Sequence, residues 1–217
     1  MDHSVILSRT ADHVRILLSG DSAGHDWWHI ERVRRVALTI AREEQANLFL
    51  VELAALLHDV ADWKFAGGDE QAGPAAARKW LLSLEVDEPT IDHVCRIIGQ
   101  LSFKGAGVAT PMDSLEGACV QDADRLEAIG AIGIARTFAY GGWKGQSMHD
   151  PELPPQLHGS FTEYKHNKGT TINHFYEKLL LLKDRMNTAA GKRMAEARHE
   201  FMQQYLDQFF AEWEGKK

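Results

Sequence analysis

The sequence predicts an all-α fold, built as a single-domain helical bundle. Apolar residues recur every three or four positions along most of the 217 residues, and no run alternates with the period of two that is typical of a half-buried strand. The apolar fraction of 44% and the charged fraction of 25% are those of an ordinary globular protein, and the length suits one domain. We therefore expect one domain over residues 1–217.

The helical periodicity also sets the order of the elements. The expected helices are residues 5–17, 28–41, 50–57, 74–85, 88–101, 114–128, 130–140, 172–187 and 189–213. Three prolines and several glycines predict a long loop at about 141–171, which is either a functional loop or a disordered one. The helical tail after it has an apolar stripe from Phe201 to Trp213, which indicates either core packing or the interface of a homodimer.

The charge and the cysteines exclude several classes of protein. Lys and Arg number 24 and Asp and Glu number 31, so the net charge of −7 argues against a broad surface for a nucleic-acid polymer or an anionic membrane. Cys95 and Cys119 are too few for a disulfide scaffold and indicate a reducing, cytoplasmic compartment. The N-terminus lacks the apolar core of a signal peptide, and the most apolar stretch, 48–57, is too short to span a bilayer.

Three polar residues interrupt the apolar segment LLHDVAD. One residue of a helix turns 100°, so His58 and Asp62 would lie one turn apart, with Asp59 beside them. Imidazole nitrogen and carboxylate oxygen are ligands that suit Mn, Fe, Mg or Zn. The alternative is a His-Asp pair at a helix end that hydrogen-bonds a neighbouring backbone group.

Two other segments supply residues of the same kinds. His25 and His29 are spaced i, i+4 and can share a helix face, so one would ligate an ion while the other bonds a ligand or the substrate. His25 alternatively caps the helix or faces solvent. Asp122 and Asp124 are two residues apart and point to opposite sides of a helix, so they cannot both face one metal ion.

The motifs HDWWHIERV, LLHDVADWKF, SFKG and QDADRLEAIGAIGIARTFAYGG resemble the small single-domain bacterial members of the HD superfamily of metal-dependent phosphohydrolases. The resemblance covers nearly the whole chain and includes nucleotide pyrophosphohydrolases. It implies an HD-type helical bundle and the hydrolysis of phosphate esters or anhydrides. It also implies that His29, His58, Asp59 and Asp124 are the metal ligands, with Asp124 preferred over Asp122.

The resemblance implies a divalent metal ion as the cofactor, and we expect one ion: Mn, Mg, Fe, Ni or Zn, with Mn favoured. Such an ion polarises a phosphoryl oxygen and lowers the pKa of a bound water. Asp62 is then the expected catalytic residue, which orients or deprotonates the water, although it would alternatively fix a ligand histidine. We expect a single ion because the helix after the His-Asp pair offers only His93 for a second one.

A phosphorylated substrate needs positive charge from this acidic protein, and we expect at least two of five cations to line the pocket. The candidate substrate-binding residues are Lys64, Lys104, Arg136, Lys144 and Lys178. The expected reaction converts a nucleoside triphosphate to the monophosphate and pyrophosphate. The nearest alternative is a nucleoside monophosphate phosphatase. A non-catalytic nucleotide or metal sensor is an alternative from another class, and a di-iron oxygenase needs more histidine ligands than the sequence offers.

Overall fold

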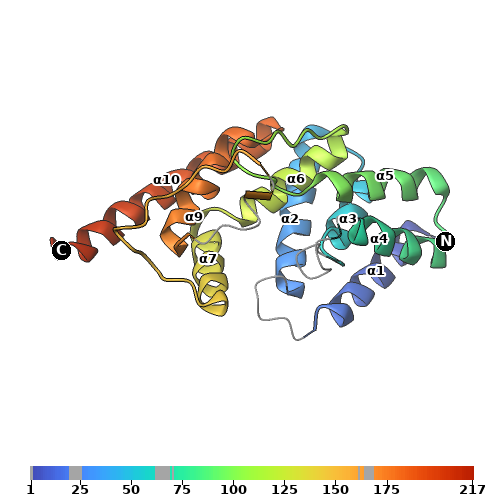
Figure 1. Ribbon diagram of the computed structural model, residues 1–217. Helices are drawn as coiled ribbons and strands as arrows, with labels where there is room; N and C mark the ends of the chain where they lie inside the picture. Colours follow the sequence, from blue (N-terminus) through green and yellow to red (C-terminus); the bar gives the residue numbers. More distant parts are fainter. Residues whose placement is uncertain (1, 20–25, 62–68, 70, 161, 164–168) are drawn as a thin grey trace. The chain divides into compact units, whose positions relative to one another are not determined.

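The computed structural model describes residues 2–19, 26–61, 69, 71–160, 162–163 and 169–217. Every regular element in this part of the chain is helical, which confirms the predicted all-α fold (Figure 1). The chain forms two compact units, which are Met1–Phe103 with Thr110–Ala123, and Lys104–Ala109 with Asp124–Lys217. The single-domain organisation stays a prediction.

The first unit is built around α3 (Leu48–Leu57), whose sequence LFLVELAALL is apolar on almost every side. Asn47 begins this helix by accepting hydrogen bonds from the backbone N–H groups of Phe49 (3.1 Å) and Leu50 (3.4 Å). Six of its ten residues are fully buried, and none of the described helices has the length and apolarity that a membrane crossing requires. The other helices of this unit are α1 (His3–Leu17), α2 (Trp27–Glu44), α4 (Ala72–Ser83) and α5 (Glu88–Gln100).

Helices α1, α2 and α5 all pack against α3, and α4 packs along α5 (Figure 1). The helix α6 (Leu115–Glu127) follows, with its first nine residues in the first unit and its last four in the second. The apolar faces that the sequence predicts are therefore buried between helices that pack around α3.

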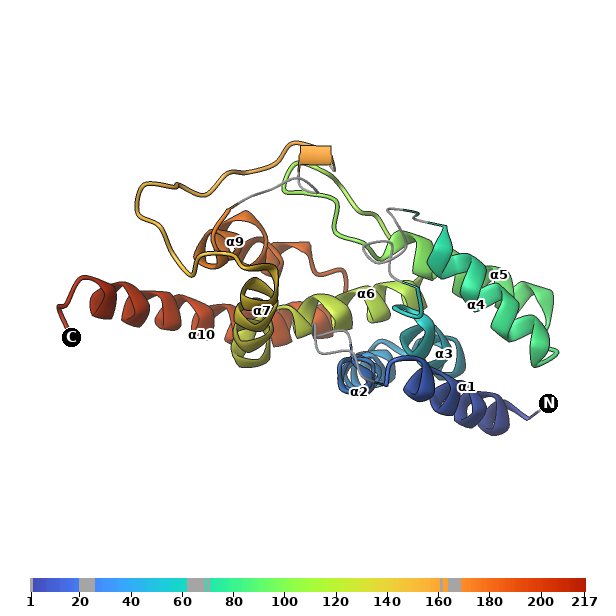
Figure 2. The ribbon, with the colours of Figure 1, turned by 60° about the horizontal axis from the view of Figure 1, so that its bottom comes forward.

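The second unit consists of α7 (Gly130–Lys144), α9 (Thr171–Glu177) and α10 (Ala189–Trp213), with two short 3₁₀ turns before α10. Helix α7 packs against both α9 and α10 (Figure 2). The fully buried ring of Phe175 lies 6.2 Å from the ring of Phe138 and 5.9 Å from that of Tyr205, measured between centroids. The apolar stripe of α10 is divided, because Met202 is buried whereas Phe201 is 47% exposed. A homodimer stays a prediction.

Two predicted boundaries differ from the structure. The helix expected over 172–187 ends at Glu177, because Lys178 leaves the helical region with φ −141° and ψ −59°. The chain then continues in the turns η1 (Leu179–Leu181) and η2 (Lys183–Arg185). The helix expected to end at residue 140 continues to Lys144, so the long loop begins at Gly145.

A glycine explains why α7 is longer than expected. Gly141 lies inside the helix and is buried, and a Cβ atom at this position would collide with Oγ1 of Thr171. Gly141, where the predicted loop would begin, instead lies within α7 and allows α7 and α9 to approach closely.

Helix α1 contacts the rest of the first unit through two stacked histidines. The ring of His3 lies 3.7 Å from that of Phe49, and the ring of His13 lies 3.8 Å from that of Trp80, each with an interplanar angle of 5°. Nε1 of Trp80 also donates a hydrogen bond of 3.0 Å to Oγ1 of Thr10. Burial lowers the pKa of His13 below its ordinary value of 6.5.

We expect this histidine to make the folded chain sensitive to mild acid. Because the pKa of His13 is lower in the folded state, the unfolded chain binds the proton more readily, so stability is lost as pH falls below 6.5 toward the folded pKa. The change His13→Phe keeps a stacked ring without a titrating group and should flatten that part of the pH profile. Urea unfolding at pH 5 and at pH 7.5 measures the difference. An equal pH dependence in the parent chain and in His13→Phe would contradict the expectation.

Candidate metal centre

His29 is positioned by the start of α2. Asp26 precedes the helix in an extended conformation and accepts a hydrogen bond of 2.9 Å from the backbone N–H of His29. This cap fixes the first turn, in which His29 is the third residue and is only 1% exposed. The motif HDWWH therefore combines a capping aspartate with a buried imidazole.

His58 and Asp59 are positioned by the end of α3. The helix ends at Leu57, with His58 at the C-cap position and Asp59 in the turn that follows. The backbone N–H of Val60 bonds to the carbonyl of Leu57 at 3.4 Å, so the chain leaves the α-helix in a tighter turn. The helix predicted to carry His58 and Asp59 therefore ends before them, at Leu57, and Asp62 lies outside the described residues.

An ion-pair network joins the two helices that carry the histidines. Glu31 of α2 accepts hydrogen bonds from Arg34 (2.8 Å) and Arg35 (2.7 Å), and Arg34 also donates to Glu52 of α3. Burial alone would raise the pKa of Glu31, but the hydrogen bonds from the two arginines outweigh it, so the pKa is lowered. The ionised network therefore fixes α2 beside α3.

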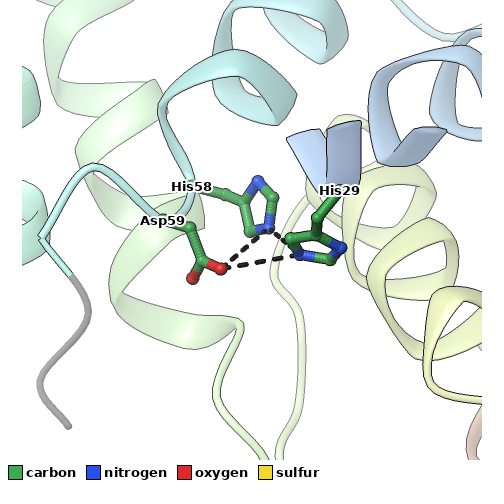
Figure 3. A group of neighbouring side chains, drawn as sticks. All are labelled: His29, His58 and Asp59. Carbon is green, nitrogen blue, oxygen red and sulfur yellow. Dashed lines mark hydrogen bonds and ion pairs between the residues drawn. The ribbon is translucent and has the colours of Figure 1, made fainter. Parts of the chain in front are cut away.

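The side chains of His29, His58 and Asp59 point toward one another (Figure 3). Nε2 of His58 lies 3.2 Å from Nε2 of His29, and Oδ2 of Asp59 lies 3.5 Å from His29 Nε2 and 3.7 Å from His58 Nε2. Ligands about 2.1 Å from a metal ion are about 3.0 to 3.4 Å apart at octahedral to tetrahedral angles. The three donor atoms are thus spaced almost as one ion would hold them.

The protonation of His58 also suits a metal ligand. Its Nδ1 lies 2.8 Å from the backbone carbonyl of Ala55, which can only accept a hydrogen bond, so Nδ1 carries the proton. In this tautomer, Nε2 is the unprotonated nitrogen, and it faces the cluster. The role of Ala55 could not be predicted from the sequence, because any residue at this position supplies the same backbone carbonyl.

The structure places the other predicted site residues as follows. Asp124 is half-buried in the part of α6 that belongs to the second unit, whereas the neighbouring Asp122 is fully buried in the part that belongs to the first. Lys64 lies outside the described residues. The remaining candidate cations, Lys104, Arg136, Lys144 and Lys178, all belong to the second unit.

The four candidate cations of the second unit differ in solvent exposure. Lys144 is exposed, and its Nζ lies 4.8 Å from the ring of Trp143 and 5.8 Å from that of Tyr140. The side chains of Lys104, Arg136 and Lys178 are half-buried.

His93 has a different neighbourhood from the two cluster histidines. Its Nε2 lies 3.7 Å from a carboxylate oxygen of Glu116. In the part of the chain that the structure describes, the group with metal-binding geometry is His29, His58 and Asp59, without His93. The number of ions stays a prediction.

Comparisons with known proteins identify the family. The model of the HD domain matches residues 27–129, the segment that contains all three cluster residues. The crystal structure of a protein from Lactobacillus plantarum superimposes with a TM-score of 0.88 at 39% identity, over 99% of this chain and 100% of that one. An HD-superfamily hydrolase from Bacillus thuringiensis does so with a TM-score of 0.76 at 45% identity, over 98% and 99%.

A third relative is YpgQ of Bacillus subtilis, which is 39% identical over 90% of this chain and 87% of its own length. The structure of YpgQ in complex with ADP superimposes with a TM-score of 0.75 at 35% identity, over 96% of this chain and 95% of that one. These matches extend over almost the whole chain, well beyond the His-Asp motif. The chain therefore belongs to the HD superfamily of metal-dependent phosphohydrolases.

Proposed function

We propose that this chain hydrolyses nucleotides, converting a nucleoside triphosphate and water to a nucleoside monophosphate and pyrophosphate. The observation that carries the proposal is the convergence of His29, His58 and Asp59, whose donor atoms lie 3.2 to 3.7 Å apart. The nucleotide as substrate is supported by YpgQ, a relative of known structure that binds ADP. A cytoplasmic location, where nucleotides are abundant, is part of the same proposal.

The proposal assigns the cofactor site to His29, His58, Asp59 and Asp124, with Mn²⁺ favoured. When bound, such an ion would polarise a phosphoryl oxygen and favour ionisation of water near neutral pH. The protein's own part is to hold two imidazoles and one carboxylate in place. The Asp26 cap holds the helical turn of His29, and the Ala55 carbonyl orients the ring of His58. We assign to Asp62 the proton that leaves the attacking water.

The candidate cations would bind the phosphate oxygens of the substrate. Lysine and arginine form charge-assisted hydrogen bonds with phosphate, which are about twice as strong as neutral ones. The proposal assigns this role to at least two of a set that consists of Lys64, Lys104, Arg136, Lys144 and Lys178. The half-buried members of the second unit are favoured over Lys144, whose exposed ammonium group lies over two aromatic rings.

The products of hydrolysis test the reaction. We expect a panel of nucleoside triphosphates with Mn²⁺ to yield one pyrophosphate for each monophosphate, with orthophosphate at background, when both anions are assayed separately. Orthophosphate released from nucleoside monophosphates would instead establish the phosphatase alternative. Nucleotide binding without any turnover would establish the sensor alternative and contradict the proposal.

A further inference from the structure

Arg185 holds the loop that carries Lys104. Its Nη1 donates hydrogen bonds to the carbonyl oxygens of Gly105 (3.2 Å) and Val108 (3.1 Å), and its Nη2 donates to that of Ala106. Three carbonyl groups from four consecutive residues therefore meet on one side chain from a distant part of the chain. Arginine is suited to this task because its planar group presents several N–H donors in a rigid fork, whereas the ammonium group of lysine does not.

The held segment, Lys104–Ala109, has an irregular backbone that depends on such contacts. Gly105 has φ 121°, and a Cβ atom there would lie 3.2 Å from the carbonyl oxygen of His158. The backbone N–H of Gly107 donates to the same oxygen at 3.1 Å. The loop is therefore fixed on one side by the segment at residues 158–160 and on another by Arg185.

Arg185 is also joined to the end of α6. Arg125, which directly follows Asp124, donates from its Nη1 to the backbone carbonyl of Arg185. Burial lowers the pKa of Arg185, but an arginine remains protonated at neutral pH and keeps its donors. Arg185 thus contacts the loop that carries Lys104, a proposed phosphate-binding residue. It also contacts the last turn of α6, which carries Asp124, a proposed metal ligand.

We infer that Arg185 is a positioning residue for the substrate, holding Lys104 where its ammonium group meets a phosphate oxygen. The inference rests on the proposed nucleotide hydrolysis. A lysine reaches its partner on a flexible four-carbon stem, so its contribution to binding depends on where its backbone is held. Loss of the Arg185 contacts therefore weakens substrate binding and leaves the chemistry at the metal centre largely intact.

Steady-state kinetics with a nucleoside triphosphate and Mn²⁺ test this role. Arg185→Ala is expected to raise KM about tenfold, the effect of one lost charge-assisted hydrogen bond, with kcat changed by less than about threefold. Lys104→Ala should raise KM to a similar extent. Because both changes remove the same contact, the double variant should be no worse than Lys104→Ala alone. Arg185→Lys keeps the charge without the fork and should lie between the parent chain and Arg185→Ala.

Arg198 offers a matched control. It is another half-buried arginine of the second unit, and its Nη1 donates to the carbonyl of Leu126 instead of to the loop. Arg198→Ala should lower the melting temperature without raising KM. Hydrogen exchange at the backbone amides of residues 105–109 should become faster in Arg185→Lys and Arg185→Ala but not in Arg198→Ala.

The outcomes separate the inference from the proposed function. If Lys104→Ala raises KM while the Arg185 variants change neither KM nor amide exchange, the inference is wrong and the proposed function stands. A double variant whose effects add would also overturn it. If Arg185→Ala does not fold, Arg185→Lys decides the question. A parent chain that hydrolyses no nucleotide would overturn the proposed function and, with it, the inference.

Discussion

Replacing Asp59 by alanine is expected to reduce nucleotide hydrolysis about 100-fold or more. The carboxylate supplies the anionic donor of the cluster, with its Oδ2 3.5 Å from His29 Nε2 and 3.7 Å from His58 Nε2. Loss of groups that merely support metal ligands already costs about 10- to 100-fold in metal affinity or activity, so loss of a ligand should cost at least as much. The measurement is kcat/KM for a nucleoside triphosphate at saturating Mn²⁺.

Two further variants make this result specific. Asp59→Asn keeps the size of the side chain and should also lose activity, because a neutral amide oxygen binds a divalent ion more weakly than a carboxylate does. Asp12→Ala removes an exposed aspartate of α1 and should retain the activity of the parent chain. Full activity in Asp59→Ala, in a chain that melts at the temperature of the parent, would exclude Asp59 as a ligand.

Replacing Phe175 by alanine is expected to lower the free energy of unfolding by about 3 to 5 kcal/mol. The ring is fully buried in the second unit and packs against the rings of Phe138 and Tyr205, which also contact each other. Its removal loses the transfer free energy of the ring and leaves a cavity that α7, α9 and α10 can fill only in part. Equilibrium unfolding in urea, followed by far-ultraviolet circular dichroism, measures the change.

The matched control is Phe201→Ala, which removes a phenylalanine of α10 that is 47% exposed. We expect its effect to lie within about 0.5 kcal/mol, as is usual for surface positions. Equal losses in the two variants would mean that Phe175 does not form the core of the second unit. A loss at Phe201 that depends on protein concentration would instead indicate that α10 lies in a homodimer interface.

Most of the fold could be predicted from the sequence because burial and local periodicity agree. The segment LFLVELAALL is apolar on nearly every side, and it becomes the buried helix α3 with Asn47 as its cap. The prediction was wrong where packing overrides local propensity. Leu179 and Leu182 are spaced as in a helix, yet Leu179 is buried from the turn η1 and Leu182 from the bend between η1 and η2. Gly141 resembles a break and lies within α7, because the partner that requires a glycine there is 30 residues away.

The candidate site could be predicted only in part. The types and spacing of His29, His58 and Asp59 indicated a metal centre, and the resemblance supplied the set of ligands. The spacing predicts that His58 and Asp59 lie on one helix face, but α3 ends at Leu57. His58 therefore lies at the C-cap position, and Asp59 lies in the turn that follows. Arg185 gave no signal, since its partners are carbonyl groups about 80 residues earlier, and carbonyl groups carry no side-chain signature.

The central claim is that His29, His58 and Asp59 hold a divalent ion, and metal stoichiometry tests it most directly. The chain would be freed of metal by a chelator, titrated with Mn²⁺, and the free ion measured by electron paramagnetic resonance. The account predicts one tightly bound Mn²⁺ for each parent chain and none for His58→Ala. No binding by the folded parent chain, or equal binding by His58→Ala, would contradict it.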